Sequence, residues 1–138
     1  MFYNMKSILG LVLFLALVVP ARAAEVGTVN ADVVRVIDGD TVEVRAAIWL
    51  GQSLVTRVRL AGIDAPDRDC PDRRARTAAR ARELLGATTT VSAIHWGKYA
   101  GRVMGRLTTR DGRDLSEVLV AEGLAKPYGG RGPRPGHC

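Results

Sequence analysis

The sequence predicts an α+β protein, a five-stranded Greek-key β-barrel of the OB-fold type with one helix after the third strand and another after the fifth. Three observations predict it. Five short β-like runs are separated by turn signals, and two helical segments fall after the third and fifth runs. The composition is that of a globular domain, 47% hydrophobic and 25% charged, with only 5% aromatic residues. This order of elements is that of a small closed barrel with an aliphatic core.

Three β-like runs come before the first helix. They are residues 31–38, "ADVVRVID", residues 41–50, "TVEVRAAIWL", and residues 54–60, "LVTRVRL". Asp38-Gly39 separates the first two runs, and Gly51-Gln52-Ser53 separates the second and third. An Asp-Gly pair between alternating apolar runs is a strong hairpin signal, so we expect Asp38-Gly39 to form a turn.

A helix is predicted in the segment "CPDRRARTAARARELLG", which follows the third run. The residues that recur at helical spacing are Ala75, Ala78, Ala79, Arg82 and Leu85. Gly86 stands directly after them and is predicted to end the helix as its C′ residue.

Two further β-like runs follow, residues 88–94 and 102–109. The second predicted helix begins at Asp114, which with Glu117 has the spacing of a capping box. Gly123 is placed to end this helix, so the chain from the first run to this glycine completes the barrel and its helices.

Residues 1–23 have the pattern of a secretory signal peptide. Lys6 precedes an apolar run at residues 8–19, and Ala21-Arg22-Ala23 supplies a cleavage signal. The alternative is a membrane anchor, but this run is shorter than the ~20 residues of a spanning helix. Cleavage after Ala23 would remove Lys6 and Arg22 and lower the formal charge from +6 to +4. We therefore expect a periplasmic or secreted protein without stable membrane association.

Both cysteines, Cys70 and Cys138, lie after the predicted cleavage site. An even number of cysteines in an oxidising compartment favours a disulfide, although two free thiols or an intermolecular pair are the alternatives. A bridge would tether the tail at residues 129–138, "GGRGPRPGHC", to the predicted domain at residues 24–128. With only His95 and His137 available beside these cysteines, the sequence predicts no zinc site.

Three segments combine acidic or basic residues with turn signals. They are "IDGDT" at residues 37–41, "RVRLAGIDAPD" at residues 57–67 and "GKYAGRVMGRL" at residues 97–107. Each alone is compatible with a solvated turn. Together they resemble the staphylococcal nuclease family, which has an IDGDT turn, an R-x-x-x-x-D-x-P-E segment and a K-Y-G-R segment in this order. The resemblance extends from Val33 to about Tyr128, most of the predicted mature chain.

The resemblance implies an active site for phosphodiester hydrolysis. Asp40 and Asp64 match the carboxylate ligands of a calcium ion, and Ala65 matches a position that supplies a backbone carbonyl ligand. Arg59 and Arg102 match the two arginines that would hold the scissile phosphate. Lys98 and Tyr99 match residues that would flank a terminal phosphate of the substrate. Asp38 matches an acid beside the calcium ligands.

These residue types fit that chemistry on physical grounds. Ca²⁺ takes about 6–8 oxygen ligands, so two carboxylates and one carbonyl leave positions for water and a phosphate oxygen. The planar fork of arginine binds two phosphate oxygens at once and stays charged. The sequence therefore predicts a calcium-dependent site.

Two positions depart from the family pattern. Asp67 stands where the family has a glutamate, the candidate general base, and its side chain is one methylene shorter. A base must lie about 2.6–3.2 Å from the proton that it accepts, so catalytic efficiency is open. Ala100 is an extra residue between Tyr99 and Gly101, which weakens the match of Lys98 and Tyr99.

The sequence thus predicts an exported, calcium-dependent nuclease acting on DNA, RNA or both, with a monomer as the expected state. The alternative is a nucleic-acid-binding OB domain in which Asp67 has weakened or abolished catalysis. A third hypothesis is an exported interaction module whose acids only form turns. Cleavage that needs calcium distinguishes the first, and salt-sensitive binding without cleavage distinguishes the second.

Overall fold

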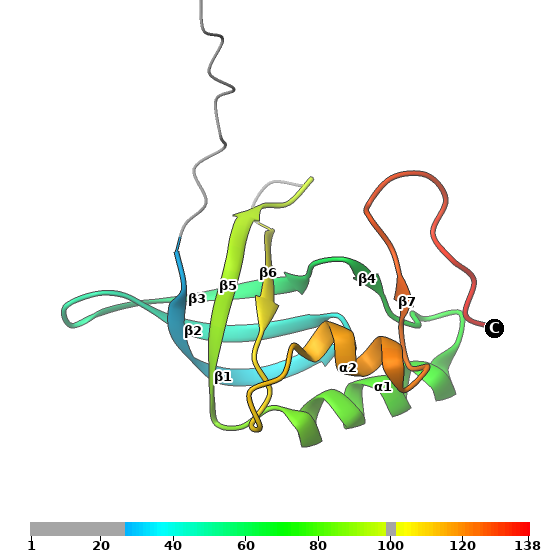
Figure 1. Cartoon of the computed structure of the whole chain (residues 1–138), viewed down its shortest axis with the longest axis horizontal. Helices are drawn as coiled ribbons and strands as arrows, with labels where there is room; N and C mark the ends of the chain where they lie inside the picture. Colours follow the sequence, from blue (N-terminus) through cyan, green and yellow to red (C-terminus); the bar gives the residue numbers. More distant parts are fainter. Residues whose placement is uncertain (1–26, 99–101) are drawn as a thin grey trace, which may run out of the picture.

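The computed structural model describes residues 27–98 and 102–138, so the predicted signal peptide and Tyr99 lie outside the described residues. Five strands form a closed barrel in the order β1-β2-β3-β6-β5, which confirms the predicted fold (Figure 1). The barrel strands are β1 (Val29–Asp38), β2 (Thr41–Trp49), β3 (Gln52–Leu60), β5 (Thr88–Trp96) and β6 (Val103–Leu107). Neighbouring strands are antiparallel except β3 and β6, whose parallel pairing closes the barrel.

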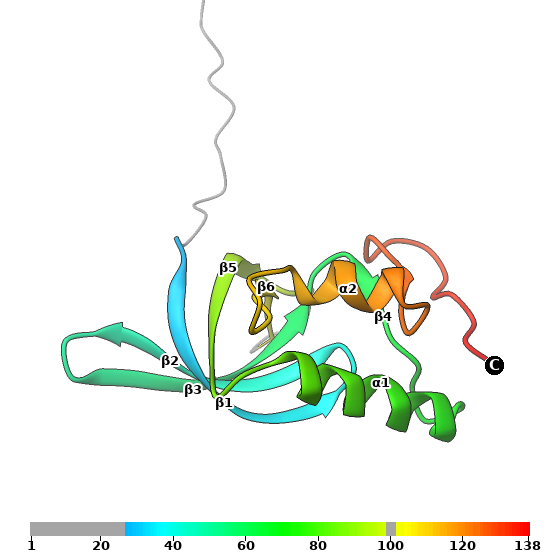
Figure 2. The same cartoon turned by 60° about the horizontal axis from the view of Figure 1, so that its bottom comes forward.

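The barrel core is aliphatic, as the shortage of aromatic residues predicts. On β2 and β3, alternate residues point inward, and Val42, Val44, Val58 and Leu60 are each at most 1% exposed. Helix α1 (Pro71–Leu84) follows the third strand, and α2 (Leu115–Ala121) follows the last barrel strand. Figures 1 and 2 show the two helices packed beside each other next to the barrel.

The buried face of α1 differs from the helical pattern in the sequence. The buried residues are Thr77, Ala78, Ala81 and Leu84, whereas Ala75, Ala79 and Arg82 are exposed. Alanines stand on several faces of this helix and distinguish them poorly. Thr77 can be buried at little cost because its hydroxyl donates to the Leu124 carbonyl at 2.8 Å.

The predicted cap residues agree with the structure at the ends of α2 but not at the end of α1. Asp114 caps α2, as predicted, and accepts from the backbone N–H groups of Ser116 and Glu117. Gly123 follows α2 with a left-handed φ of 72°. The prediction for Gly86 was wrong in its mechanism, because Leu85 is already extended after α1 and Gly86 is not left-handed. The extended backbone of Leu85, whose side chain is buried, leads the chain toward β5 instead.

The β2–β3 hairpin extends beyond the barrel, as Figure 1 shows. Trp49 pairs with Gln52, so the turn is Leu50-Gly51 rather than the predicted residues 51–53. Gly51 has a φ of 69°, which the turn requires and glycine adopts without strain. In residues 27–98 and 102–138, no helix is long and apolar enough to span a membrane.

A second, two-stranded sheet lies outside the barrel and was not predicted. It pairs β4 (Ile63–Asp64) with β7 (Lys126–Pro127) in antiparallel orientation. Two-residue strands are too short to produce a detectable sequence period. This pairing places the C-terminal chain beside the segment that contains Asp64 (Figure 1).

Candidate active site

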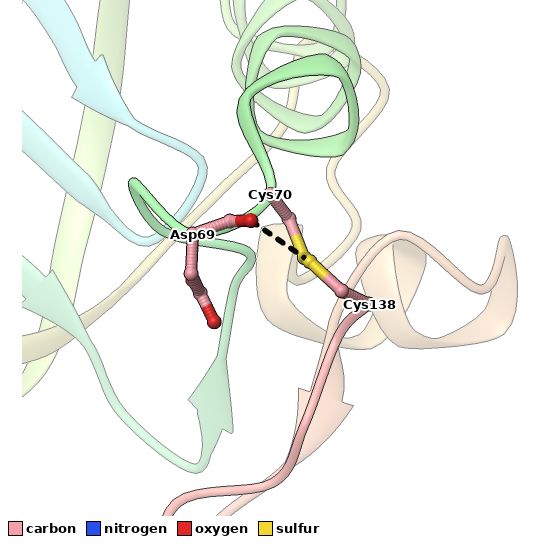
Figure 3. A group of neighbouring side chains, drawn as sticks. All are labelled: Asp69, Cys70 and Cys138. Carbon is pink, nitrogen blue, oxygen red and sulfur yellow. Dashed lines mark hydrogen bonds between the residues drawn. A yellow bond between two sulfur atoms is a disulfide. The ribbon is translucent and has the colours of Figure 1, made fainter.

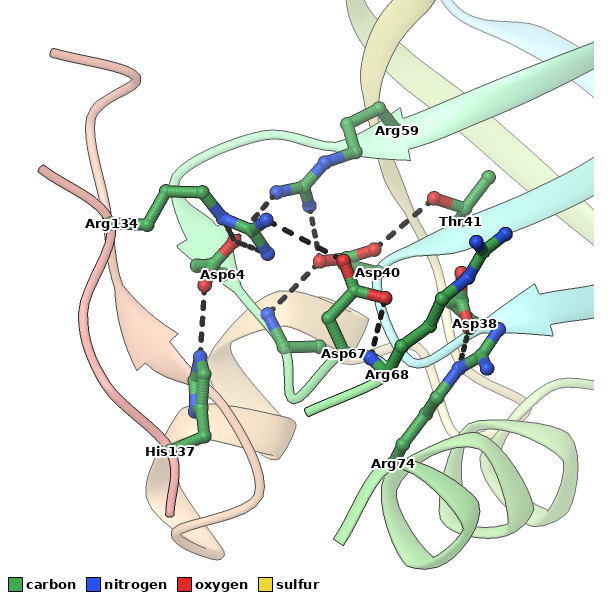
Figure 4. Close-up of polar contacts among 11 residues, drawn as sticks. Asp38, Asp40, Thr41, Arg59, Asp64, Asp67, Arg68, Arg74, Arg134 and His137 are labelled. Carbon is green, nitrogen blue, oxygen red and sulfur yellow. Dashed lines mark hydrogen bonds and ion pairs between the residues drawn. The ribbon is translucent and has the colours of Figure 1, made fainter. Parts of the chain in front are cut away.

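The site forms where the β1–β2 turn meets the end of β3. Arg59 pairs with Thr41 across the β2–β3 ladder, which places its side chain next to Asp40. Asp64 follows on β4. Arg59 Nη1 lies 2.8 Å from Asp40 Oδ2, and Arg59 Nη2 lies 3.1 Å from Asp64 Oδ1 (Figure 4). One guanidinium group therefore connects two carboxylates that are 24 residues apart in the sequence.

Asp40 belongs to the turn itself, because the two-residue turn is Gly39-Asp40 rather than Asp38-Gly39. Its side chain is held from both sides. Oδ1 accepts from the Thr41 hydroxyl at 3.1 Å, and Oδ2 accepts from the backbone N–H of Ala65 at 3.0 Å. Burial raises the pKa of Asp40 above its usual value, although Arg59 acts in the opposite direction.

Asp64 is fully buried and uses both carboxylate oxygens. Oδ1 accepts from Arg59 and also from Arg134 Nε at 3.0 Å, while Oδ2 lies 2.8 Å from His137 Nε2. Both additional partners come from the tail, which the sequence predicted only as a tethered coil. The one sequence signal for their position is Cys138, because a bridge to Cys70 brings the tail near Asp67.

Asp67 lies at the more exposed side of the site, with its side chain 44% exposed. Oδ1 accepts from the backbone N–H of Arg68 at 2.8 Å, and Oδ2 lies 3.5 Å from Arg134 Nη1. The Arg68 hydrogen bond, with a smaller contribution from Arg134, lowers the pKa of Asp67. Asp67 is therefore ionised at neutral pH, as a proton acceptor must be.

Asp38, the last residue of β1, faces helix α1. Its Oδ1 accepts from Arg74 Nε at 2.6 Å, as Figure 4 shows. This ion pair connects the start of α1 to the turn that contains Asp40, so Asp38 supports the site without contacting Asp64.

A groove of about 1030 Å³ passes over these side chains. Among its lining residues are Asp40, Arg59, Asp67, Lys98, Arg102 and Arg134. The residues predicted for cation, phosphate and water line this groove, apart from Asp64, which is fully buried, and Tyr99, which lies outside the described residues. The positively charged groups along this groove suit a polyanionic ligand.

A disulfide joins Cys70, directly before α1, to Cys138, with a Cα–Cα distance of 5.8 Å (Figure 3). Cys138 Sγ also lies 3.1 Å from the carbonyl oxygen of Asp69. In the described part of the chain, Asp69 and these cysteines form a group of three potential metal ligands. Disulfide sulfurs carry no thiolate charge, so we do not interpret this group as a metal site.

The pair of Asp40 and Asp64 fits a hard divalent cation. Both carboxylates are at most 8% exposed and face one cationic group, and oxygen ligands of this kind are those that Ca²⁺ prefers. Arg59 Nη1 is buried and has no hydrogen bond in the described part of the chain, although it contacts Asp40 as an ion pair.

Comparison with known proteins agrees with this geometry. The family model described as "Staphylococcal nuclease homologue" matches residues 57–137, more than half of the chain. The chain belongs to the staphylococcal nuclease family. The match contains Arg59, Asp64, Asp67 and the C-terminal tail through His137, whereas Asp40 lies before its first residue.

Two relatives in this comparison are described as "Uncharacterized endonuclease", one from Escherichia coli and one from Escherichia coli O157:H7. Each is 33% identical to this chain over 100 residues, which cover 72% of this chain and 61% of the relative. The chain thus spans less than two thirds of the length of these relatives.

Proposed function

We propose that this member of the staphylococcal nuclease family is an exported, calcium-dependent nuclease that hydrolyses phosphodiester bonds of DNA, RNA or both. The single observation that carries the proposal is the convergence of Asp40 and Asp64 on the guanidinium of Arg59 beside a positively charged groove. Family membership and the printed names of the two relatives support it. The residue roles below are part of this proposal.

Asp40, Asp64 and the backbone carbonyl of Ala65 would hold the cation. When bound, Ca²⁺ would polarise the phosphodiester and stabilise the negative charge that develops on its oxygens. The Ala65 N–H and the Thr41 hydroxyl already orient Asp40, so this ligand is positioned before substrate arrives. The small number of protein ligands predicts weak calcium binding to the protein alone.

Arg59 and Arg102 would bind the scissile phosphate, with Lys98 and Tyr99 contacting a terminal phosphate farther along the substrate. Both arginines line the groove, which supports this role. Preorganised donors of this kind typically contribute about 3–4 kcal/mol each to transition-state stabilisation.

Asp67 would accept a proton from the attacking water. Its low pKa and short side chain make it a weaker base than the glutamate of the family pattern. Its hydrogen bond to Arg68 and its contact with Arg134 also favour a second candidate function, binding of nucleic acid with little or no cleavage.

The test is cleavage of single-stranded DNA and of RNA by the mature protein with calcium, and with a chelator as control. We expect cleavage that the chelator and Asp40→Asn each abolish. Salt-sensitive binding without cleavage would instead establish the second function. Cleavage that persists without any divalent cation would contradict the assigned site.

Export has its own test. Mass spectrometry of the protein from the periplasm or medium should give a chain that begins at Ala24, and sedimentation should give a monomer. The intact first residue in a cytoplasmic protein would contradict export without affecting the nuclease proposal.

A further inference from the structure

We infer that His137 is a positioning residue for Asp64, and that Arg134 competes with the divalent cation for the same carboxylate. Both residues belong to residues 128–138, which we call the C-terminal strap. The inference rests on the proposed cation site and adds two residues that the sequence motifs do not contain.

The strap is held at both ends. At its start, the β4–β7 ladder and a hydrogen bond from the Tyr128 N–H to the Gly62 carbonyl, 2.9 Å long, fix it beside Asp64. At its end, the disulfide fixes Cys138 to the start of α1. Inside the strap, the Tyr128 hydroxyl donates to the Gly132 carbonyl at 2.8 Å. A segment without regular secondary structure thus has a defined path across the site.

His137 approaches Asp64 from the side opposite Arg59, as Figure 4 shows. Its side chain is 5% exposed and does not line the groove, whereas Arg59 and Arg134, which contact Oδ1, both do. Asp64 itself is fully buried and does not line the groove. Because His137 Nε2 holds Oδ2, the carboxylate cannot rotate without losing this contact, and Oδ1 stays toward the two arginines that do line the groove. Such partners of a ligating group commonly determine how well it binds a metal.

Arg134 has the opposite relation to the cation. Its guanidinium contacts Asp64 Oδ1 at 3.0 Å and reaches Asp67, so it places positive charge between two of the acids of the site. Its side chain is 52% exposed, which leaves room for it to move into solvent when Oδ1 binds a cation. The same strap therefore contributes one buried group that favours the cation and one exposed group that opposes it.

The experiment measures calcium affinity of the full mature protein by NMR titration with Ca²⁺ alone. We expect His137→Ala to weaken binding by about 10-fold or more, with His137→Gln recovering part of the loss through its side-chain N–H. Arg134→Gln should tighten binding about two- to fivefold, as expected for removal of an exposed ion pair. Arg131→Gln removes equal charge from the strap without a contact to Asp64 and should have a smaller effect.

The outcomes separate this inference from the proposed function. A wild-type protein that binds no calcium, or an Asp40→Asn variant that binds it equally well, would overturn both. Normal wild-type binding with unchanged affinity in folded His137→Ala would overturn the positioning role alone. If His137→Ala does not fold, His137→Leu fills the same buried space without a donor and is compared with His137→Gln. Weaker calcium binding by His137→Leu than by His137→Gln supports the positioning role, and equal binding by the two variants contradicts it. If Arg134→Gln binds calcium no more tightly than Arg131→Gln, the proposed competition between Arg134 and the cation would be overturned.

Discussion

Gly39 of the β1–β2 turn packs directly against Thr77 of helix α1. A Cβ atom on Gly39 would lie 2.2 Å from Thr77 Cγ2 and 2.9 Å from Thr77 Cβ, closer than side-chain atoms approach one another. The φ of Gly39 is not left-handed, so the contact rather than the backbone conformation requires glycine. This contact determines how the turn that contains Asp40 lies on the helix.

Gly39→Ala should therefore destabilise the protein by about 1–3 kcal/mol, the usual cost of inserting a methyl group into a packed interior. Thr77→Ser removes Cγ2 and keeps the hydroxyl that donates to Leu124. In urea denaturation, the loss of stability of the double variant Gly39→Ala, Thr77→Ser should be smaller than the sum of the losses of the two single variants, because both changes affect the same contact. Simple additivity would contradict this explanation.

Arg102→Ala should reduce the rate of cleavage without unfolding the protein. Arg102 is exposed and lines the groove, so its removal opens no cavity in the barrel core. Loss of one preorganised donor predicts a decrease of about 10²–10³-fold in kcat. Rates under saturating substrate measure it, and urea denaturation provides the control. A kcat within threefold of the wild-type value corresponds to a change in activation free energy on the order of 1 kcal/mol or less. That result would mean that Arg102 does not stabilise the transition state.

Arg59→Ala should lose activity and stability together. The structure places Arg59 between two buried carboxylates, with its side chain 14% exposed. Removing one partner of a buried ion pair costs about 3–5 kcal/mol. Calcium should restore part of the lost stability by replacing the positive charge. Thermal denaturation with and without calcium, compared with Arg59→Lys, tests both effects.

The barrel could be predicted from the sequence because alternation, turns and caps are local signals. Its five strands and both helices lie where the pattern placed them, with ends shifted by a few residues. Arg59 and Asp64, which the resemblance singled out in one short segment, contact each other in the structure, and their roles stay predictions. Local signals did not predict why Gly39 is glycine, because the reason is a contact with Thr77 in another element.

Arg134 and His137 could not be predicted for a related reason. They are 70 and 73 residues after Asp64 in the chain, and they reach it only because the β4–β7 ladder and the disulfide fix the path of the strap. Neither two-residue strands nor a Gly- and Pro-rich tail has a period that marks a contact. The disulfide was considered from the cysteine count, but its consequence for Asp64 depends on three-dimensional placement.

Asp67→Glu should raise kcat, because the longer side chain reaches one methylene farther into the groove. The present carboxylate is held by the Arg68 N–H and contacts Arg134, which keeps its pKa low and limits its strength as a base. Asp67→Asn should lower kcat by about 10²–10⁴-fold, the usual contribution of a general base. Single-turnover cleavage with calcium measures both variants. A lower rate for Asp67→Glu would show that the loop is already adapted to aspartate.

Cys138→Ser should destabilise the protein by about 4 kcal/mol, because the bridge closes a loop with a sequence separation of 68 residues. Urea denaturation of the oxidised wild type and of this variant measures the difference in the free energy of unfolding. A reductant should lower the free energy of unfolding of the wild type to that of the variant and should leave the value for the variant unchanged. The double variant Cys70→Ser, Cys138→Ser should have the same free energy of unfolding as either single variant. A loss below about 1 kcal/mol would mean that the β4–β7 ladder and the contacts of His137 hold the strap without the bridge. That result would make the pairing of the tail with Asp64 a property of the fold rather than of the oxidising compartment.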